Sequence, residues 1–134
     1  MAKIKKINHV AIAVKDVEES LKFWRDALGL QVDHTENVPS QKAEVVFIPV
    51  GDSEIELVRP TSPDTGVAKF LEEHGGGMHH LCFEVDHIDE MLGQLKKKGI
   101  RLINEVALEL PGRKMAFIHP KSTNGVLVEL YEVT

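Results

Sequence analysis

Cysteine is almost absent from the chain, and aromatic residues are scarce. The 134 residues include one cysteine, Cys82, and aromatic residues make up 5%. A single cysteine cannot form an intramolecular disulfide, which fits a reducing compartment and excludes cysteine-rich zinc sites. The few aromatic side chains and the formal net charge of −5 disfavour binding to nucleic acid or to an anionic membrane surface. We therefore expect neither nucleic acid nor a membrane as a partner.

Long hydrophobic runs are also missing. No apolar segment is long enough to predict a transmembrane helix, and the first residues lead into no signal-like apolar stretch. These absences predict a cytoplasmic protein. A length of 134 residues with 43% hydrophobic residues is typical of one domain with a filled core, so we expect a single domain over residues 1–134.

A repeated segment is the main feature of the sequence. The segment Asn8–Val14 recurs as His79–Val85, so that His9 corresponds to His80, 71 residues later. In both copies apolar residues alternate with a row that begins with the histidine, which is the period of a strand buried on one face. The repeat predicts two related half-domains, each with a histidine on the face opposite its apolar row.

A helix is predicted after each of these strands. Asp16, with Glu19 three residues later, is a capping box for the first helix, and Gly29 ends it. Asp86 is the predicted cap of the second helix, and Gly99 ends it after a run of lysines. The predicted apolar stripes are Val17, Leu21, Trp24 and Leu28 in the first helix and Ile88, Met91, Leu92 and Leu95 in the second.

Three further strands are predicted in each half. They span residues 30–34, 44–50 and 54–58, and then 101–104, 114–119 and 126–132. We predict an α+β fold of two tandem βαβββ modules, at about residues 1–60 and 78–134, joined by a crossover at about 61–77 that contains a short helix. The modules are expected to form a half-open, barrel-like mixed sheet around a metal site.

Two histidines and two glutamates recur at matched positions. Glu56 and Glu129 stand in the last strand of each half, 47 residues after His9 and 49 residues after His80. By the strand period each glutamate faces away from its apolar neighbours. If the two halves associate with pseudo-twofold symmetry, the four side chains converge. Two imidazoles and two carboxylates suit a divalent ion such as Zn, Co, Ni, Mn or Fe and leave positions for substrate oxygens.

Four segments of the chain, residues 9–14, 20–30, 75–81 and 119–130, match a known family pattern. Through them the chain resembles the vicinal-oxygen-chelate superfamily and, within it, the methylmalonyl-CoA epimerase family. It implies epimerisation of methylmalonyl-CoA at C2, a place in propionate metabolism and one divalent metal, often cobalt. The implied metal ligands are His9, His80 and Glu129, with Glu56 at a further position.

The implied reaction needs two acid/base groups, because inversion through a planar enolate removes a proton from one face and returns it to the other. We predict Glu129 and Glu44 in these roles, with a metal-bound water that relays the proton as the alternative to Glu129. A cation would stabilise the enolate charge. Coenzyme A is polyanionic, so basic residues of the second half, Arg113, Lys114 and Lys121, are candidates to bind its phosphates. Exposed strand edges favour a homodimer.

Three other activities use the same fold and remain open at this point. A glyoxalase I-type lactoylglutathione lyase would use the same two histidines and two glutamates. An iron dioxygenase would use two histidines and one glutamate. A small-molecule-binding protein of this superfamily would bind its ligand without catalysis.

Overall fold

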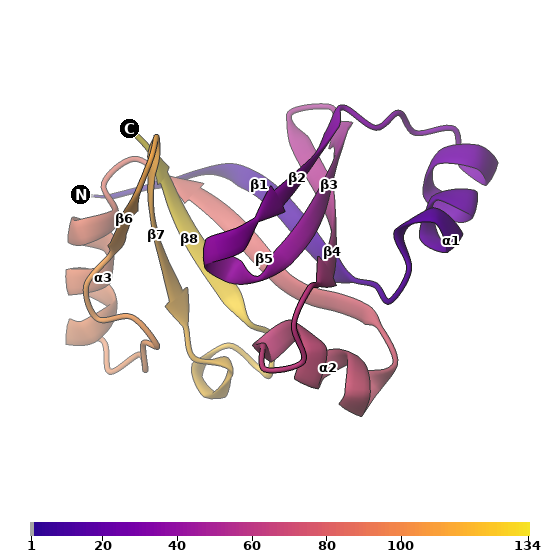
Figure 1. Ribbon diagram of the computed structural model, residues 1–134. Helices are drawn as coiled ribbons and strands as arrows, with labels where there is room; N and C mark the ends of the chain where they lie inside the picture. The colour runs from indigo at the N-terminus through magenta and orange to yellow at the C-terminus, as the bar shows by residue number, and fades with distance from the viewer. Residues whose placement is uncertain (1) are drawn as a thin grey trace. The chain divides into compact units, whose positions relative to one another are not determined.

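The computed structural model describes residues 2–134 and divides them into two compact units. One unit comprises residues 9–79, and the other comprises residues 80–134 together with residues 2–8. Each unit contains a mixed sheet and helices (Figure 1). The predicted α+β class and the two tandem βαβββ modules are confirmed. Within the described residues, no helix is both long enough and apolar enough to cross a membrane.

The first unit contains a sheet with the strand order β2-β3-β4-β1. Strand β1 is parallel to β4, while β2, β3 and β4 are antiparallel neighbours. The strands are β1 (Ile4–Ala13), whose residues from His9 onward belong to this unit, β2 (His34–Val38), β3 (Ala43–Val50) and β4 (Ser53–Pro60). The helices are α1 (Val17–Leu21), the π-helix η1 (Lys22–Ala27), the 3-10 turn η2 (Pro39–Gln41) and α2 (Gly66–His74).

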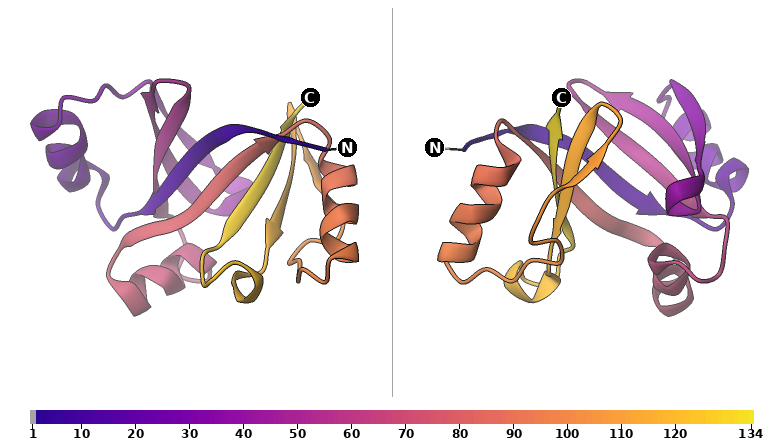
Figure 2. Two further views of the ribbon diagram at one scale, coloured as in Figure 1. Left: turned by 180° about the vertical axis from the view of Figure 1, so that it is seen from behind. Right: turned by 60° about the vertical axis from the view of Figure 1, so that its left-hand side comes forward.

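The second unit repeats this plan with the order β5-β8-β7-β6. Strand β5 is parallel to β8, and β8, β7 and β6 are antiparallel neighbours. Its elements are β5 (Gly77–Val85), whose residues from His80 onward belong to this unit, α3 (Ile88–Lys97), β6 (Leu108–Leu110), β7 (Arg113–Ile118), the 3-10 turn η3 (Pro120–Ser122) and β8 (Val128–Val133). Both views in Figure 2 show α3 alongside this sheet.

Each sheet packs its helix against one face, on the predicted apolar rows. In the first unit Val46, Ile48 and Leu57 form this core with Leu21 of α1. In the second unit α3 contributes Ile88 and Leu92, which pack against the residues Val85, Ala116, Ile118, Val128 and Leu130. The opposite face of the first sheet, predicted to be open, is also packed near α2: Ala11, Ala43, Val45 and Val58 form a second buried cluster there.

The first helix ends differently from the prediction. Asp16 caps it as expected, since its Oδ1 accepts a hydrogen bond from Glu19 N at 3.0 Å. Beyond Leu21 the helix widens to a π-helix, in which Leu28 N donates to Phe23 O at 2.8 Å. A widened turn rotates the following side chains around the axis. Leu28 is consequently exposed (53%), and the prediction that it joins the apolar stripe was wrong.

The cap of α3 comes from a distant strand. The predicted cap, Asp86, instead accepts a hydrogen bond from Lys3 N at 2.8 Å, and this bond lowers its pKa. Residue His87 occupies the N-cap position without a side-chain cap bond. Glu132 of β8 takes this role, because its Oε1 accepts from Ile88 N at 2.7 Å. A carboxylate at this position also interacts favourably with the helix dipole.

We expect Glu132→Ala to lower the free energy of unfolding by about 1–2 kcal/mol, because the partly buried Ile88 N–H loses its acceptor. Asp86→Asn should cost less, because its side chain keeps an oxygen that can accept from Lys3 N. Urea denaturation of both variants measures the difference. A larger loss in Asp86→Asn would show that Asp86 stabilises α3 more than Glu132 does.

Two predicted strands are shifted along the chain. Residues 30–34 form a connection in which Leu30 and Val32 pack against the helix-side core, and the strand begins at His34. Residues 101–104 contribute only an isolated bridge between Leu102 and Ile118, and the edge strand forms later, at Leu108–Leu110. Both connecting segments contain apolar residues among polar ones, as a short strand also does.

Candidate metal and active site

The first unit brings His9 and Glu56 together. Strands β1 and β4 run parallel, with Ala11 opposite Glu56 in the register, so the histidine and the glutamate share one face of the sheet. The Nδ1 atom of His9 lies 3.1 Å from Oε2 of Glu56. His9 is 4% exposed. A half-buried carboxylate beside a buried imidazole is a costly arrangement unless each satisfies the other or both bind a cation.

The second unit repeats this arrangement with His80 and Glu129. Strands β5 and β8 are parallel, with Cys82 opposite Glu129. The Nε2 atom of His80 lies 3.1 Å from Oε1 of Glu129, and Glu129 is 6% exposed. The matched positions predicted from the repeat therefore form one His–Glu pair in each unit.

The geometry of each pair fits a divalent metal. Two ligands that bind one ion at about 2.1 Å and at right angles lie about 3 Å apart. The nitrogen–oxygen separation in both pairs is 3.1 Å, so one cation can be bound by both members of a pair. Imidazole nitrogen and carboxylate oxygen are donors that Zn, Co, Ni and Mn accept.

A phenylalanine lies beside each glutamate. No pattern in the sequence indicated these two phenylalanines as site residues. Phe47 is opposite Glu56 across β3 and β4, and Phe117 is opposite Glu129 across β7 and β8. The ring of Phe117 makes an edge contact with His80 at a centroid distance of 5.6 Å. Each unit therefore has an aromatic ring beside its glutamate, and in the second unit that ring also contacts the histidine.

Phe47 also has an imidazole neighbour. The ring of His34 stacks on it at 4.4 Å. The Asp33 carboxylate, 2.5 Å from Nδ1 of His34, raises the pKa of this imidazole, and Glu36 adds to the shift. His34 is on edge strand β2, beside the face that bears Glu56.

Glu44, predicted as a second acid/base group, is not brought to the His9–Glu56 pair. It is registered opposite Arg59, and its Oε1 accepts from Nε of Arg59 at 3.0 Å. Phe47, three residues later, is the residue of β3 that is opposite Glu56. Because side chains alternate along a strand, Glu44 lies on the other face of this sheet, together with Val46 and Ile48.

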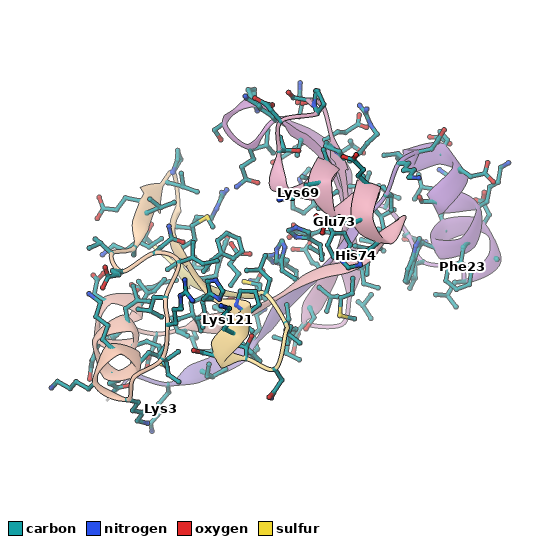
Figure 3. All side chains as sticks on the ribbon, turned by 90° about the horizontal axis from the view of Figure 1, so that it is seen from below. Lys3, Phe23, Lys69, Glu73, His74 and Lys121 are labelled. Carbon is teal, nitrogen blue, oxygen red and sulfur yellow. The ribbon has the colours of Figure 1, made fainter. Side chains whose placement is uncertain are left out.

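The three basic residues predicted to bind phosphate lie in different places. Lys114 faces α3, where its Nζ lies 3.1 Å from Asp89, and this carboxylate raises its pKa. Arg113 shares a face with Glu129, and its guanidinium lies over the Tyr131 ring at 5.9 Å. Lys121 is exposed on the turn η3 (Figure 3).

The chain is similar to known proteins of one superfamily. The model of the Glyoxalase/Bleomycin resistance protein/Dioxygenase superfamily matches residues 8–117. The human mitochondrial methylmalonyl-CoA epimerase is 44% identical over 93% of this chain and 72% of its own length. The ethylmalonyl-CoA/methylmalonyl-CoA epimerase of Cereibacter sphaeroides is 38% identical over 97% of this chain and 99% of its own.

A solved structure gives the same result at the level of the fold. A variant of Streptomyces coelicolor methylmalonyl-CoA epimerase, in complex with 2-nitronate-propionyl-CoA, aligns with a TM-score of 0.88 and 29% identity. The alignment covers 98% of this chain and 96% of that chain. The chain therefore belongs to the Glyoxalase/Bleomycin resistance protein/Dioxygenase superfamily and, within it, to the methylmalonyl-CoA epimerase family.

Proposed function

We propose that the chain epimerises methylmalonyl-CoA at C2, with one divalent metal ion held jointly by the two His–Glu pairs. The observation that carries this proposal is the equal 3.1 Å geometry of His9–Glu56 and His80–Glu129 in a chain 44% identical to the human epimerase. The Streptomyces relative binds a nitronate analogue of an acyl-CoA. A nitronate is planar and anionic, as the enolate of this reaction is.

The chain's own residues bind the metal ion and remove the C2 proton in this reaction. A bound divalent cation supplies Lewis-acid stabilisation for negative charge on the substrate oxygens. His9 and His80 supply neutral nitrogen ligands. Glu129, buried beside His80, is the carboxylate that takes the C2 proton, and partial burial keeps water from competing for that proton.

Glu56 replaces Glu44 as the second acid/base group in this proposal. Inversion requires a proton donor on the side of C2 opposite the base. Glu56 has the same position in the first unit as Glu129 has in the second, next to a histidine and opposite a phenylalanine. In this proposal Glu129 removes the C2 proton on one side, and a protonated Glu56 donates a proton on the other.

Arg113 is the basic residue that shares a face with Glu129, and we assign it to the acyl-CoA binding surface. Its guanidinium has no ion pair within residues 2–134, whereas Lys114 is paired with Asp89. The contact with the Tyr131 ring leaves the guanidinium N–H groups able to donate to substrate oxygens.

Proton exchange at C2 tests the proposed function directly. The metal-loaded protein is incubated with (2R)-methylmalonyl-CoA in deuterated water. NMR follows deuterium at C2, and a coupled mutase detects the S form. We expect exchange with inversion that depends on added Co, Zn, Ni or Mn.

Absence of exchange with all four metals would refute the epimerase activity. The hemithioacetal of glutathione and methylglyoxal would then be tested, since a lactoylglutathione lyase uses the same donor set. Binding of acyl-CoA without exchange or lyase activity would favour a non-catalytic binding protein.

Glu44→Gln is expected to exchange the C2 proton within about threefold of the wild-type rate. Its carboxylate pairs with Arg59 on the face of the sheet away from Glu56, so its charge is not available at the site. The same NMR assay measures the rate. A loss of 100-fold or more would restore Glu44 as an acid/base group and exclude the assignment to Glu56.

Several finer expectations stay predictions. They are one divalent ion per chain from among Co, Zn, Ni and Mn, a homodimer, a cytoplasmic location and a place in propionate metabolism.

A further inference from the structure

Two cationic residues and a histidine are fixed together at one end of the second unit's sheet, where β7 leads into η3. His119 N donates to Arg101 O at 2.9 Å, and Lys121 N donates to Nδ1 of His119 at 3.0 Å. Arg101 N in turn donates to Oγ of Ser122 at 2.9 Å. These hydrogen bonds join two segments that are about 20 residues apart in the sequence. We refer to Arg101, His119 and Lys121 as the cationic cluster.

The charges of this cluster are not neutralised by carboxylates. Within residues 2–134, the side chains of Arg101 and Lys121 form no ion pair, whereas Arg25, Arg59 and Lys114 each have an acidic partner. Partial desolvation and the nearby charges of Arg101 and Lys121 lower the pKa of His119. A chain of net charge −5 thus keeps an unpaired positive group at this place.

His119 adds a neutral donor to the two charges. Its Nδ1 accepts the Lys121 N–H bond, so the proton of the neutral ring is on Nε2. The cluster therefore offers a guanidinium, an ammonium and an imidazole N–H. This donor set matches the oxygens of a phosphate or pyrophosphate group.

The cluster lies at the end of the sheet that also carries the His80–Glu129 pair. Phe117 is registered opposite Glu129, and His119 follows it by two residues, a distance of about 7 Å along an extended chain. Figure 3 shows Lys121 on the turn that leads toward β8. Arg113, in contrast, is at the opposite end of β7.

We propose that Arg101, His119 and Lys121 bind the phosphate groups of the coenzyme A portion of the substrate. This inference rests on the proposed function, because it takes the reacting thioester to lie at Glu129. The pantetheine arm then spans from Glu129 to the cluster. Of the three basic residues predicted from the sequence to bind phosphate, only Lys121 takes this role, and Arg101 and His119 join it.

The double variant Arg101→Gln/Lys121→Gln tests this site in the full-length, metal-loaded protein. Two thioesters are compared: methylmalonyl-CoA and methylmalonyl-pantetheine, which has the same reacting group without phosphates. We expect KM for the CoA thioester to rise about 100-fold, about tenfold for each charge removed, with kcat within twofold. Kinetics with the pantetheine thioester should stay unchanged.

Lys97→Gln/Lys98→Gln is the matched control, because it removes two positive charges from the exposed end of α3. It should leave KM for both thioesters within twofold of wild type. An equal rise of KM in this control would mean that net charge alone causes the effect and would overturn the proposal. An unchanged KM in the cluster variant, or a rise with both thioesters, would do the same.

Direct binding separates this inference from the proposed function. Calorimetry with coenzyme A, dephospho-CoA and pantetheine needs no turnover. If the wild-type protein exchanges no C2 proton but binds coenzyme A, and the cluster variant loses that affinity by tenfold or more, the phosphate site stands and the epimerase activity does not. Equal coenzyme A affinity in wild type and variant would refute the phosphate site whatever the activity.

Discussion

We expect Glu129→Gln to exchange the C2 proton about 10² to 10⁴ times more slowly than the wild type. The amide keeps the shape of the carboxylate and an oxygen for the neighbouring groups, but it cannot take up a proton at neutral pH. Glu129 is 6% exposed and lies 3.1 Å from His80, so little water can reach this position and act as the base in its place. The loss should appear in kcat.

Loss of the base must be separated from loss of the metal, because the same carboxylate is proposed to bind the ion. The metal content of Glu129→Gln is therefore measured by mass spectrometry, and the assay is repeated with excess metal. We expect exchange to remain slow at full metal occupancy. Recovery to within tenfold of the wild-type rate would mean that Glu129 acts only as a ligand.

Glu132→Gln is the matched control on the same strand. Glu132 faces α3, three residues beyond Glu129, and its carboxylate accepts from Ile88 N. We expect this variant to be less stable but to exchange the proton at the wild-type rate while it is folded. Equal loss of activity in both variants would indicate disruption of β8 instead of loss of a base.

Most of the site residues were predicted from the two-residue period of the strands. Because side chains alternate with a period of two, the sequence alone placed His9 and His80 opposite their apolar rows, and Glu56 and Glu129 opposite theirs. The internal repeat then matched the two pairs. Their 3.1 Å contacts required the parallel register of β1 with β4 and of β5 with β8, which joins residues about 50 apart.

The face of the sheet on which Glu44 lies could not be predicted from the sequence. A residue of β3 reaches the face of Glu56 only if the pairing of β3 with β4 places it there, and this register sets Phe47 opposite Glu56. Apolar residues occupy both faces of β3, as Val45 and Val46 do, so the sequence gives no alternation from which to choose.

Long-range contacts explain the other differences. The cap of α3 comes from Glu132, 44 residues after Ile88, whereas local capping rules favour Asp86. The cationic cluster likewise depends on the hydrogen bond between His119 and Arg101. Neither pairing has a spacing signature in the sequence.

Metal binding is the second property for which we expect a large effect. In the proposed site one ion is shared by both pairs, so the wild type should bind one divalent ion per chain. His9→Ala and His80→Ala should each weaken binding by 100-fold or more, although the two residues belong to different units. Titration with Co or Zn, monitored by calorimetry, gives both the affinity and the stoichiometry.

The same ion should stabilise the fold. At a free metal concentration of 100 times Kd, binding adds about 2.7 kcal/mol to the free energy of unfolding, and this increment disappears with a chelator. The two histidine variants should unfold at the same temperature with and without metal. His87→Ala, which removes an exposed imidazole that makes no cap hydrogen bond at α3, should keep the full metal-dependent increment.

Stoichiometry decides whether the two pairs act together. If each His–Glu pair binds its own ion, the wild type takes up two ions per chain, and each single variant keeps one of them with unchanged affinity. If the pairs share an ion, the wild type takes up one, and either substitution removes it. Only the shared ion places Glu56 and Glu129 around one substrate carbon. A result of two independent ions would therefore refute the assignment of Glu56 as the group that returns the proton.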